Sequence, residues 1–214
     1  MGVRFPHGLF EKLHQKRWGF SVCVLLVHGK VFTLSAIMTL AEELLALTKS
    51  EACPIALRAA FQERIKQGSL TREEDSVSHT IVDFLPFNVQ TKKIFVVHHK
   101  KSGRWLVPAG HIDYGESLLQ ALNREIEEEL GIKECFAFLP EPFLFTVSSI
   151  DNPNQACRTH FGAWFLLETD GSDFRVNFSE FYEVRWVSFS EARALFVAPS
   201  HIAALDKLEA LFNK

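Results

Sequence analysis

The sequence predicts an α+β or α/β/α layered domain with a mixed sheet, preceded by an N-terminal helical segment. Two observations predict this fold. From residue 38 onward, helical periodicity, strand-like stretches, a helix, further strands and closing helices follow one another along the chain. Hydrophobic residues make up 47% of the 214 residues, which is enough for one core and a small extra element.

Two helices are expected before the strands. Leucines lie at helical spacing in residues 39–50, and a second helical pattern follows over residues 54–68. The second helix ends at Gly68, because glycine readily adopts the left-handed conformation found after helix ends. Together the two segments predict a helical hairpin ahead of the main domain.

Strands and three more helices are expected downstream. The strand-like stretches, rich in β-branched and aromatic residues, are 79–87, 93–99, 104–110, 135–139, 143–150, 159–169 and 183–189. A helix begins after the capping box of Ser117 and Gln120 and ends at Gly131. Its expected buried stripe consists of Leu119, Leu122, Ile126 and Leu130. The closing helices cover 190–196 and 201–212, the latter capped by Ser200.

Residues 1–37 are expected to form an N-terminal extension. The stretch is basic, and its apolar run 20–27 is too short for a bilayer span, which needs about 20 residues. It fits an upstream extension before a natural start at Met38, a targeting segment or a structural element. The expected organisation is therefore extension 1–37, helical segment 38–76 and main domain 77–214. The protein is expected in the cytoplasm, with organelle targeting by the extension left open.

Charge and cysteine usage narrow the class of protein. The net charge of −3 gives no electrostatic case for nucleic-acid binding, and neither a nucleic-acid partner nor a membrane is expected. The four cysteines are scattered without a C-x-x-C pair. This pattern predicts reduced, buried thiols of a cytosolic protein rather than a disulfide framework or a zinc site.

An unusual crowd of acids ends the central helix. Residues 124–129 read REIEEE, and two carboxylates about 5 Å apart in a desolvated cleft repel by roughly 3 kcal/mol. On a helical wheel Glu125, Glu128 and Glu129 fall within about 100° of arc beside the apolar stripe, whereas Glu127 points elsewhere. Hard oxygen ligands on one face suit Mg²⁺ or Mn²⁺, which would turn the repulsion into binding energy.

The stretch from Gly110 to Ile132, referred to below as the box, resembles the signature of the Nudix hydrolase family, G-x5-E-x7-R-E-U-x-E-E-x-G-U, where U is aliphatic. All nine specified positions match, beginning with Gly110, Glu116, Arg124 and Glu125. The resemblance implies a Nudix-type α/β/α sandwich over 77–214. It also implies a divalent-metal-dependent hydrolase that cleaves the pyrophosphate bond of a nucleoside diphosphate linked to another moiety.

The resemblance also implies the metal ligands. Glu125, Glu128 and Glu129 match the metal-binding acids of the family's box helix, and the backbone carbonyl of Ala109 matches a further ligand. The family usually has glycine where this chain has Ala109, so this ligand depends on whether the backbone tolerates a Cβ. Many members add a later acid shortly before a tryptophan, and Glu180 is favoured for it over Glu183.

Catalytic and substrate-binding roles follow from the same match. Arg124 matches the arginine that orients a metal-binding glutamate, and Glu116 matches the supporting acid at the helix start. The candidates for the base are Glu128 and Glu180. The catalytic candidates are thus Glu128, Glu129, Arg124 and Glu180, and the substrate-binding candidates are Arg104, His111 and Glu116.

A second function stays open beside the enzyme. A catalytically silent Nudix-like module would bind or sense a nucleotide without turnover, and the helical segment 38–76 could serve a partner or a homodimer. The complete set of box acids favours the enzyme, because a binder has no need for all three of Glu125, Glu128 and Glu129.

Overall fold

The computed structural model describes residues 23–27, 30–34, 38–153 and 155–212, and the chain forms two compact units, Met1–Thr39 and Leu40–Lys214. In the first unit, β1 (Cys23–Val27) and β2 (Lys30–Leu34) pair as an antiparallel hairpin. Most of the predicted extension 1–37 lies outside the described residues. No helix in the described part of the chain is long and apolar enough to cross a membrane.

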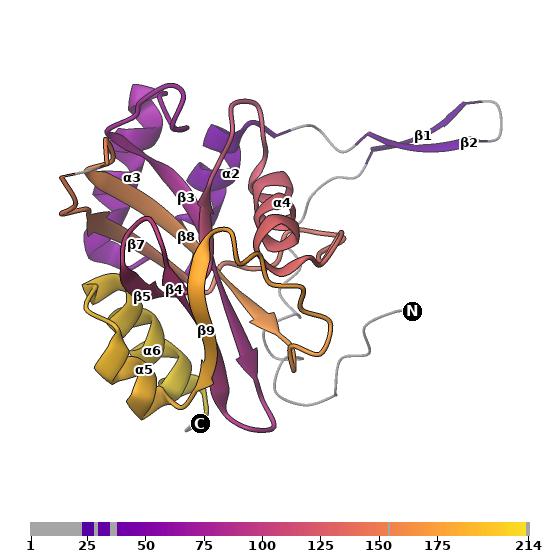
Figure 1. Ribbon diagram of the computed structural model, residues 1–214. Helices are drawn as coiled ribbons and strands as arrows, with labels where there is room; N and C mark the ends of the chain where they lie inside the picture. The colour runs from indigo at the N-terminus through magenta and orange to yellow at the C-terminus, as the bar shows by residue number, and fades with distance from the viewer. Residues whose placement is uncertain (1–22, 28–29, 35–37, 154, 213–214) are drawn as a thin grey trace. The chain divides into compact units, whose positions relative to one another are not determined.

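The second unit is built on a seven-stranded sheet (Figure 1). Its strands are β3 (Ser78–Asn88), β4 (Lys93–His99), β5 (Arg104–Leu106), β6 (Ala109–His111), β7 (Leu144–Ser149), β8 (Thr159–Glu168) and β9 (Phe181–Val187). The main order is β5-β4-β3-β8-β7, with β6 paired to β3 and β9 paired to β4. The sheet is mixed as predicted, because β3 and β8 run parallel and the other pairs are antiparallel.

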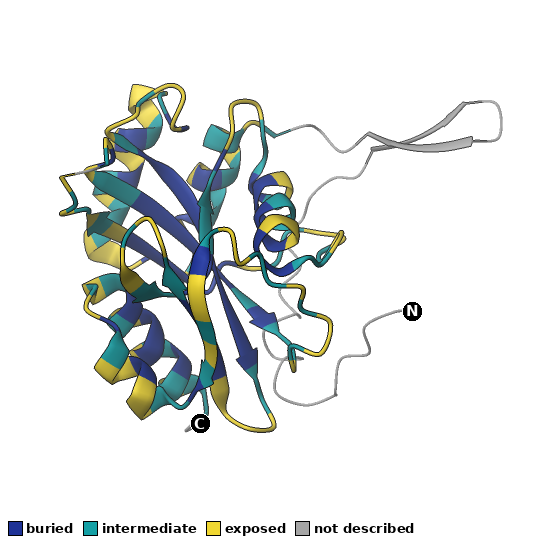
Figure 2. Cartoon of the chain, viewed as in Figure 1, coloured by how far each residue is buried: buried dark blue, intermediate teal, exposed yellow. Residues whose placement is uncertain are grey.

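Strand β3 is the centre of the sheet and positions the acidic box. Its residues 79–87 are all buried, the pattern of a strand covered on both faces (Figure 2). Strand β4 pairs with β3 only near the hairpin, at Phe87 and Asn88. Further along, β6 takes that place beside Ile81–Asp83. The first residues of the box therefore lie against a strand that is buried along nearly its whole length.

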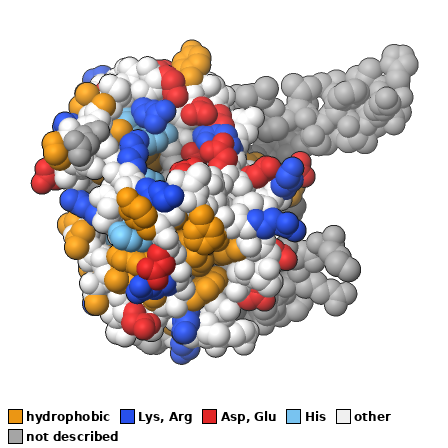
Figure 3. Space-filling view, viewed as in Figure 1, with side chains coloured by type: hydrophobic (Ala, Val, Ile, Leu, Met, Phe, Trp, Pro, Cys, Tyr) orange, Lys and Arg blue, Asp and Glu red, His pale blue; other side chains and the backbone are white. Residues whose placement is uncertain are grey.

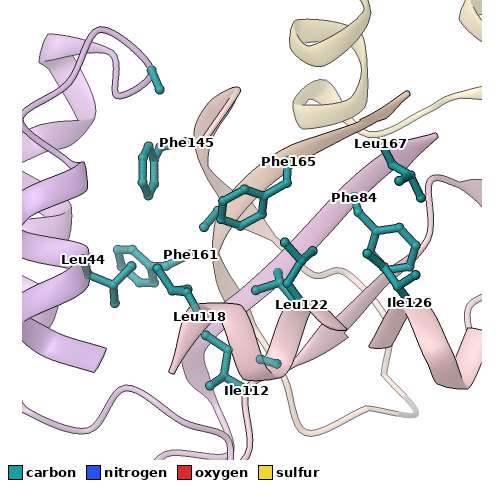
Figure 4. Close-up of a cluster of buried hydrophobic side chains, with 14 of the residues drawn as sticks. Leu44, Phe84, Ile112, Leu118, Leu122, Ile126, Phe145, Phe161, Phe165 and Leu167 are labelled. Carbon is teal, nitrogen blue, oxygen red and sulfur yellow. The ribbon is translucent and has the colours of Figure 1, made fainter. Parts of the chain in front are cut away.

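Helices cover both faces of this sheet. They are α2 (Leu40–Leu47), α3 (Ile55–Gln67), α4 (Leu118–Leu130), α5 (Phe189–Leu195) and α6 (Pro199–Phe212). Figure 4 shows Leu122 and Ile126 of α4 packed near Phe84 of β3 and Phe165 of β8. On the opposite face, the ring of Trp164 in β8 lies 5.1 Å from that of His201 in α6. This is the predicted α/β/α arrangement.

The N-terminal helices pack into the same core as the box helix. Leu44 of α2 and Phe61 of α3 are fully buried in it, and Phe61 makes edge contacts with Phe145 and Phe161 at 5.2 Å each. The carboxylate of Glu43 accepts a hydrogen bond of 2.8 Å from the backbone N–H of Leu118. An acid from α2 thus satisfies a free donor in the first turn of α4.

Three expected elements differ from the prediction. The strand expected over 104–110 divides at Pro108 into β5 and β6, which pair with different strands. The expected strand 135–139 is a loop, because the Asn123 side chain hydrogen-bonds both the N–H and the carbonyl of Phe136 in place of a neighbouring strand. Helix α6 begins at Pro199, so Ser200 lies inside it and does not cap it.

Candidate active site

The box helix α4 begins and ends as predicted. Ser117 Oγ accepts from the backbone N–H of Gln120, and the Gln120 side chain accepts from the backbone N–H of Ser117. Gly131 follows the helix with a left-handed φ of 73°, and its N–H donates to the carbonyl of Glu127. Because both ends are fixed, the acids between them have defined orientations.

Arg124 is the positive charge among these acids. Its guanidinium binds Glu116 with two hydrogen bonds of 2.8 Å each and Glu125 with one of 2.7 Å. It also donates to the backbone carbonyl of His111 at 2.7 Å and approaches Glu128 at 3.4 Å. Burial alone would raise the pKa of Glu116, but the hydrogen bonds from Arg124 and the Asp113 N–H lower it below its usual value. Arg124 therefore ties the loop before α4 to the acids within it.

Glu125 and Glu129 are buried acids. They are 8% and 2% exposed, so Glu129 lies within the buried face of the helix rather than at its border. Burial raises the pKa of Glu125 to about 7 against the opposing effect of Arg124, and nearby Glu128 and Glu180 raise it further. Burial, followed by repulsion from Glu125 and Glu180, raises the pKa of Glu129 well above its usual value.

Glu129 has an oxygen that the protein leaves without a partner. Its carboxylate accepts a hydrogen bond from the backbone N–H of Ala109, yet Oε2 is buried and has no hydrogen-bond partner among the described residues. An unpartnered buried carboxylate oxygen beside a second buried acid is unfavourable by itself. A divalent cation would satisfy both, and a donor set of carboxylate and carbonyl oxygens suits Mg²⁺ or Mn²⁺.

Glu180 reaches the acid cluster from a distant part of the chain. The segment 175–177 is bound to the end of α4, because the N–H groups of Arg175 and Asn177 donate to the carbonyls of Leu130 and Glu129 at 2.7 and 2.9 Å. The Asn177 side chain then donates to Glu180 at 3.3 Å. Glu183, the alternative in the sequence, is exposed and pairs with Arg185.

The remaining acids of the helix are more exposed. The side chain of Glu128 is 52% exposed, next to the buried pair. Glu127 is exposed on another side and lies 3.5 Å from Lys133, as expected for a solvated acid. Figure 3 shows acidic side chains gathered with Lys and Arg side chains in the upper part of the visible face.

Close approach explains the glycine that opens the box. A Cβ on Gly110 would lie 1.7 Å from Cδ of Glu125, so only glycine leaves room for that carboxylate. Ala109 needs no such exception, since Lys92 and Glu134 are the non-glycine residues with positive φ in the described part of the chain. The backbone of Ala109 therefore tolerates its Cβ.

Two predicted substrate contacts lie outside the acid cluster. Arg104 is exposed at the start of β5, and its guanidinium lies 3.4 Å from the carbonyl of Asp151. The ring of His111 faces His79 and His160, with centroids 4.9 and 5.4 Å away. Burial, with the nearby His160 and His79, lowers the pKa of His111 to about 3, so this imidazole offers no positive charge at neutral pH.

A cluster around His111 was missed from the sequence. His79, His111, Cys157 and His160 each offer a ligand atom, and these atoms lie within 4.8 Å of one another. Cys53, Cys135 and Cys157 are free, as expected, and Cys53 and Cys157 are buried as predicted, whereas Cys135 is half-buried. The prediction that the cysteines form no zinc site is based on the missing C-x-x-C pair and does not consider the C-x-x-H spacing of Cys157 and His160, which is the one local sign of this cluster.

This chain belongs to the Nudix family, since the NUDIX domain model matches residues 77–208. An RNA pyrophosphohydrolase of Francisella philomiragia is 30% identical over 108 residues, 45% of this chain and 70% of that protein. Nudix hydrolase 6 of Arabidopsis thaliana is 30% identical over 128 residues, 54% of this chain and 41% of that protein.

A solved hydrolase of the NUDIX family from Clostridium perfringens is similar at 20% identity, with a TM-score of 0.48 over 62% of this chain and 97% of that chain. The family match to 77–208 and the sheet topology confirm the predicted family and fold class. The relatives are named as a pyrophosphohydrolase and a Nudix hydrolase, which is the enzyme class predicted from the sequence.

Proposed function

We propose that this protein is a divalent-metal-dependent hydrolase of the pyrophosphate bond in a nucleoside diphosphate linked to another moiety. The observation that carries the proposal is the buried pair Glu125 and Glu129, with the unpartnered Oε2 of Glu129. A nucleotide-binding module without turnover has no evident need for two buried acids that repel each other. The family membership supports the same class of reaction.

The proposed metal ligands are the acids of the cluster and one backbone group. They are Glu125, Glu128, Glu129, Glu180 and the carbonyl of Ala109. Mg²⁺ or Mn²⁺, when bound there, would neutralise the charge of the anhydride oxygens and acidify a bound water. The hard oxygen donors support this choice of cation, and the raised pKa values of Glu125 and Glu129 reflect two buried carboxylates that lack enough positive charge nearby.

The chain's own residues divide the remaining work. Arg124 holds Glu125 in place, and Glu116 acts through Arg124 because both its oxygens are bound to that guanidinium. We assign Glu116 this positioning role in place of a substrate contact. Glu128 and Glu180 are the candidates for the base that accepts a proton from the attacking water, since both lie beside the buried pair and neither is fully buried.

The proposed substrate is a nucleotide derivative, and of the two further contacts predicted from the sequence we keep Arg104 and not His111, because the His111 ring faces His79 and His160. Several relatives are named RNA pyrophosphohydrolases, so an RNA carrying a 5′-terminal pyrophosphate linkage belongs among the compounds to be tested. The net charge of −3 favours small nucleotides over RNA.

A substrate panel tests the proposal. We expect Mg²⁺-dependent hydrolysis of at least one nucleoside diphosphate derivative to a nucleoside monophosphate and the phosphorylated moiety, and a loss of about 100-fold or more in kcat for Glu129→Gln. The matched control is Glu127→Gln, on the same helix but exposed, which should retain wild-type rates. Binding without turnover across the whole panel would contradict the proposal and favour the silent module.

A further inference from the structure

We propose that His79, His111, Cys157 and His160 form a second metal site, closed and four-coordinate, which binds a transition metal ion, foremost Zn²⁺. The four ligand atoms lie within 4.8 Å of one another in the described structure. Imidazole nitrogens and a thiolate are donors that zinc takes in proteins, and four protein ligands are typical of its structural sites. The proposal does not rest on the hydrolase reaction, because none of these side chains belongs to the acid cluster.

Pairing in the sheet brings the ligands together. His79 and His160 are register partners on the parallel strands β3 and β8. His111, on β6, pairs with Ile81, two residues beyond His79 and therefore on the same face of β3. Cys157 lies just before β8, and the backbone of the next residue is bound to the carbonyl of Val77. The site is thus fixed by backbone hydrogen bonds rather than by a loop alone.

The distances to the thiol fit a tetrahedral site. Zinc bonds of about 2.3 Å to sulfur and 2.0–2.1 Å to nitrogen place the two ligand atoms about 3.6 Å apart in a tetrahedron. Cys157 Sγ lies 3.6 Å from Nε2 of His79 and 3.8 Å from Nε2 of His111. The sulfur is therefore already close to the separation that a shared zinc ion would require from both of these nitrogens.

Hydrogen bonding prepares one imidazole for a metal. Nδ1 of His79 lies 2.8 Å from the carbonyl of Asp75, which can only accept, so Nδ1 carries the proton and Nε2 keeps its lone pair. Backbone carbonyls orient metal-binding histidines in this way. That free Nε2 points toward Cys157.

A hydrogen-bonded cluster without a metal would leave polar atoms unsatisfied. Nε2 of His160 is buried and has no hydrogen-bond partner among the described residues. The single proton of the Cys157 thiol can serve one acceptor, although two imidazole nitrogens lie close to its sulfur. One metal ion would satisfy all four ligands at once.

Charge and burial decide which metal fits. His79 is fully buried and Cys157 is 5% exposed, with Arg72 and Lys101 lining a surface hollow beside Cys157. No carboxylate belongs to the cluster, so a strongly bound ion must gain its energy from nitrogen and sulfur donors. Such donors select Zn²⁺ over Mg²⁺, in contrast to the oxygens of the box. The hollow also offers an entry path.

A metal here would stiffen the first strand of the box. It would link β3, β6, β8 and the residue Cys157 before β8 through side chains from three separate parts of the sequence. The carbonyl of His111 accepts from Arg124 at 2.7 Å, so the strand held by the metal also holds the arginine that positions Glu125. The role assigned to the site is structural, since all four positions are filled by protein ligands.

Metal analysis and Co²⁺ substitution test the proposal on the full-length chain. We expect one equivalent of Zn²⁺ per chain after purification without chelators. Replacement by Co²⁺ should give a thiolate-to-cobalt charge-transfer band and the intense visible bands of a tetrahedral site. Cys157→Ser should lose the charge-transfer band. His160→Asn should weaken Zn²⁺ affinity by about 10–100-fold or more, since losing even a residue that only supports a ligand has an effect of that size.

Matched controls separate this site from the rest of the molecule. Cys53→Ser and His201→Asn alter a buried cysteine and a buried histidine elsewhere, and both should keep the metal and the spectrum. Glu129→Gln removes a box acid and should keep them as well, so failure of this proposal and failure of the hydrolase proposal give different results. A charge-transfer band that survives Cys157→Ser, or cobalt spectra with only weak octahedral bands, would overturn the inference.

A further measurement covers the case in which the Cys157 variant does not fold. In the wild-type chain, a chelator should increase the rate of Cys157 alkylation by about tenfold or more, because removal of the metal frees the sulfur to react. Peptide mass spectrometry measures this rate. Cys135, half-buried and outside the cluster, serves as the internal reference. Equal rates of Cys157 alkylation with and without chelator would overturn the inference.

Discussion

Two clusters of side chains lie on either side of one short strand and differ in almost every chemical respect. They are the acid cluster of Glu125, Glu128, Glu129 and Glu180 and the histidine–cysteine cluster of His79, His111, Cys157 and His160. Strand β6 contributes Ala109 and Gly110 beside the acids and the ring of His111 to the other cluster. The first cluster gathers carboxylates around one guanidinium, whereas the second holds neutral imidazoles and a thiol. In the two proposals one strand would therefore serve a site for Mg²⁺ or Mn²⁺ and a site for Zn²⁺, because donor type rather than position selects the ion.

The two clusters also differ in how the protein compensates them. Arg124 neutralises part of the first, yet Glu129 keeps an unpartnered oxygen. In the second cluster the unpartnered atom is a ring nitrogen of His160, and burial lowers the pKa of that histidine to about 4. The comparison indicates that each cluster has an unmet interaction. The acids lack enough positive charge nearby, and the ring nitrogens and sulfur of the second cluster lack a group that can bind their lone pairs.

Among the variants that separate the two clusters, Gly110→Ala should have the largest effect on activity. The new Cβ would lie 1.7 Å from Cδ of Glu125, so the carboxylate must move away from its place. A misplacement of about 1 Å in a catalytic site can cost roughly 100-fold, and we expect kcat/KM to fall by at least that factor. The zinc content should stay unchanged, because Gly110 contributes no ligand to the second cluster.

Ala109→Gly is the matched control on the neighbouring residue. Its backbone already has an ordinary φ, so removing the Cβ leaves the carbonyl available, and kcat/KM should stay close to wild type. Steady-state kinetics with Mg²⁺ and metal analysis measure both variants. Wild-type activity in Gly110→Ala would show that the position of Glu125 is not needed for turnover.

Arg124→Lys should have the second largest effect. Lysine cannot reproduce the two parallel bonds to Glu116 together with those to Glu125 and the His111 carbonyl. We expect kcat/KM to fall about 10–100-fold, the usual cost of losing a residue that orients a metal ligand. Arg193→Lys, in an exposed pair with Asp206, is the control and should change neither activity nor metal content.

The Arg124 variant also sharpens the relation between the two clusters. If they communicate through the His111 carbonyl, the cobalt spectrum of the histidine–cysteine site should shift in Arg124→Lys although no ligand is altered. An unchanged spectrum together with the expected loss of activity would show that the strand insulates one cluster from the other.

The contrast between the clusters explains what could be predicted from sequence. The acids of α4 are contiguous and recur at helical spacing, so their common face follows from 100° per residue. Helix α4 itself was evident from Ser117 and Gly131, whose capping chemistry is local. His79, His111, Cys157 and His160 share no local pattern and meet only through the pairing of β3 with β6 and β8.

The same reasoning accounts for the errors in secondary structure. Residues 135–139 have strand-like composition, yet the Asn123 side chain satisfies the backbone of Phe136 and leaves Phe138 86% exposed. Burial of Glu129 was likewise invisible, because a glutamate near an apolar stripe gives no measure of how deeply the stripe is covered. Both outcomes depend on tertiary contacts that composition does not encode.

Proton release offers a smaller effect that is specific to the acid cluster. The pKa of Glu125 is raised to about 7, chiefly by burial, and a bound divalent cation requires the deprotonated form. Below pH 7, we expect the apparent Mg²⁺ affinity to increase as the pH increases, by up to about tenfold per pH unit for each proton released. Calorimetric titrations in buffers of different ionisation enthalpy measure the number of protons.

Glu125→Gln provides the control for this pH dependence. The variant should bind Mg²⁺ more weakly, and the part of the pH dependence that comes from Glu125 should be lost. An affinity that stays constant between pH 6 and 8 in the wild type would contradict the raised pKa and, with it, the idea that uncompensated burial of acids prepares the site for a cation.

Asp83 gives the smallest expected effect and tests burial of an acid with no metal role. It lies on β3, and its Oδ2 is buried against Gly162 and has no hydrogen-bond partner among the described residues. Burial raises its pKa well above the usual value. The stability linked to this group is therefore fully present below its unfolded pKa of 3.8 and is lost as pH rises toward the folded pKa.

Asp83→Asn should remove this loss, since asparagine keeps the shape of the side chain without an ionisable proton. We expect the variant to match the wild type at acidic pH and to gain about 1–3 kcal/mol at and above neutral pH, the usual scale for an unsatisfied buried group. Urea unfolding at several pH values measures it, with the exposed Asp206→Asn as control. A stability difference that does not grow with pH would mean that Asp83 does not titrate, and that buried acids in this fold need no cation to remain tolerable.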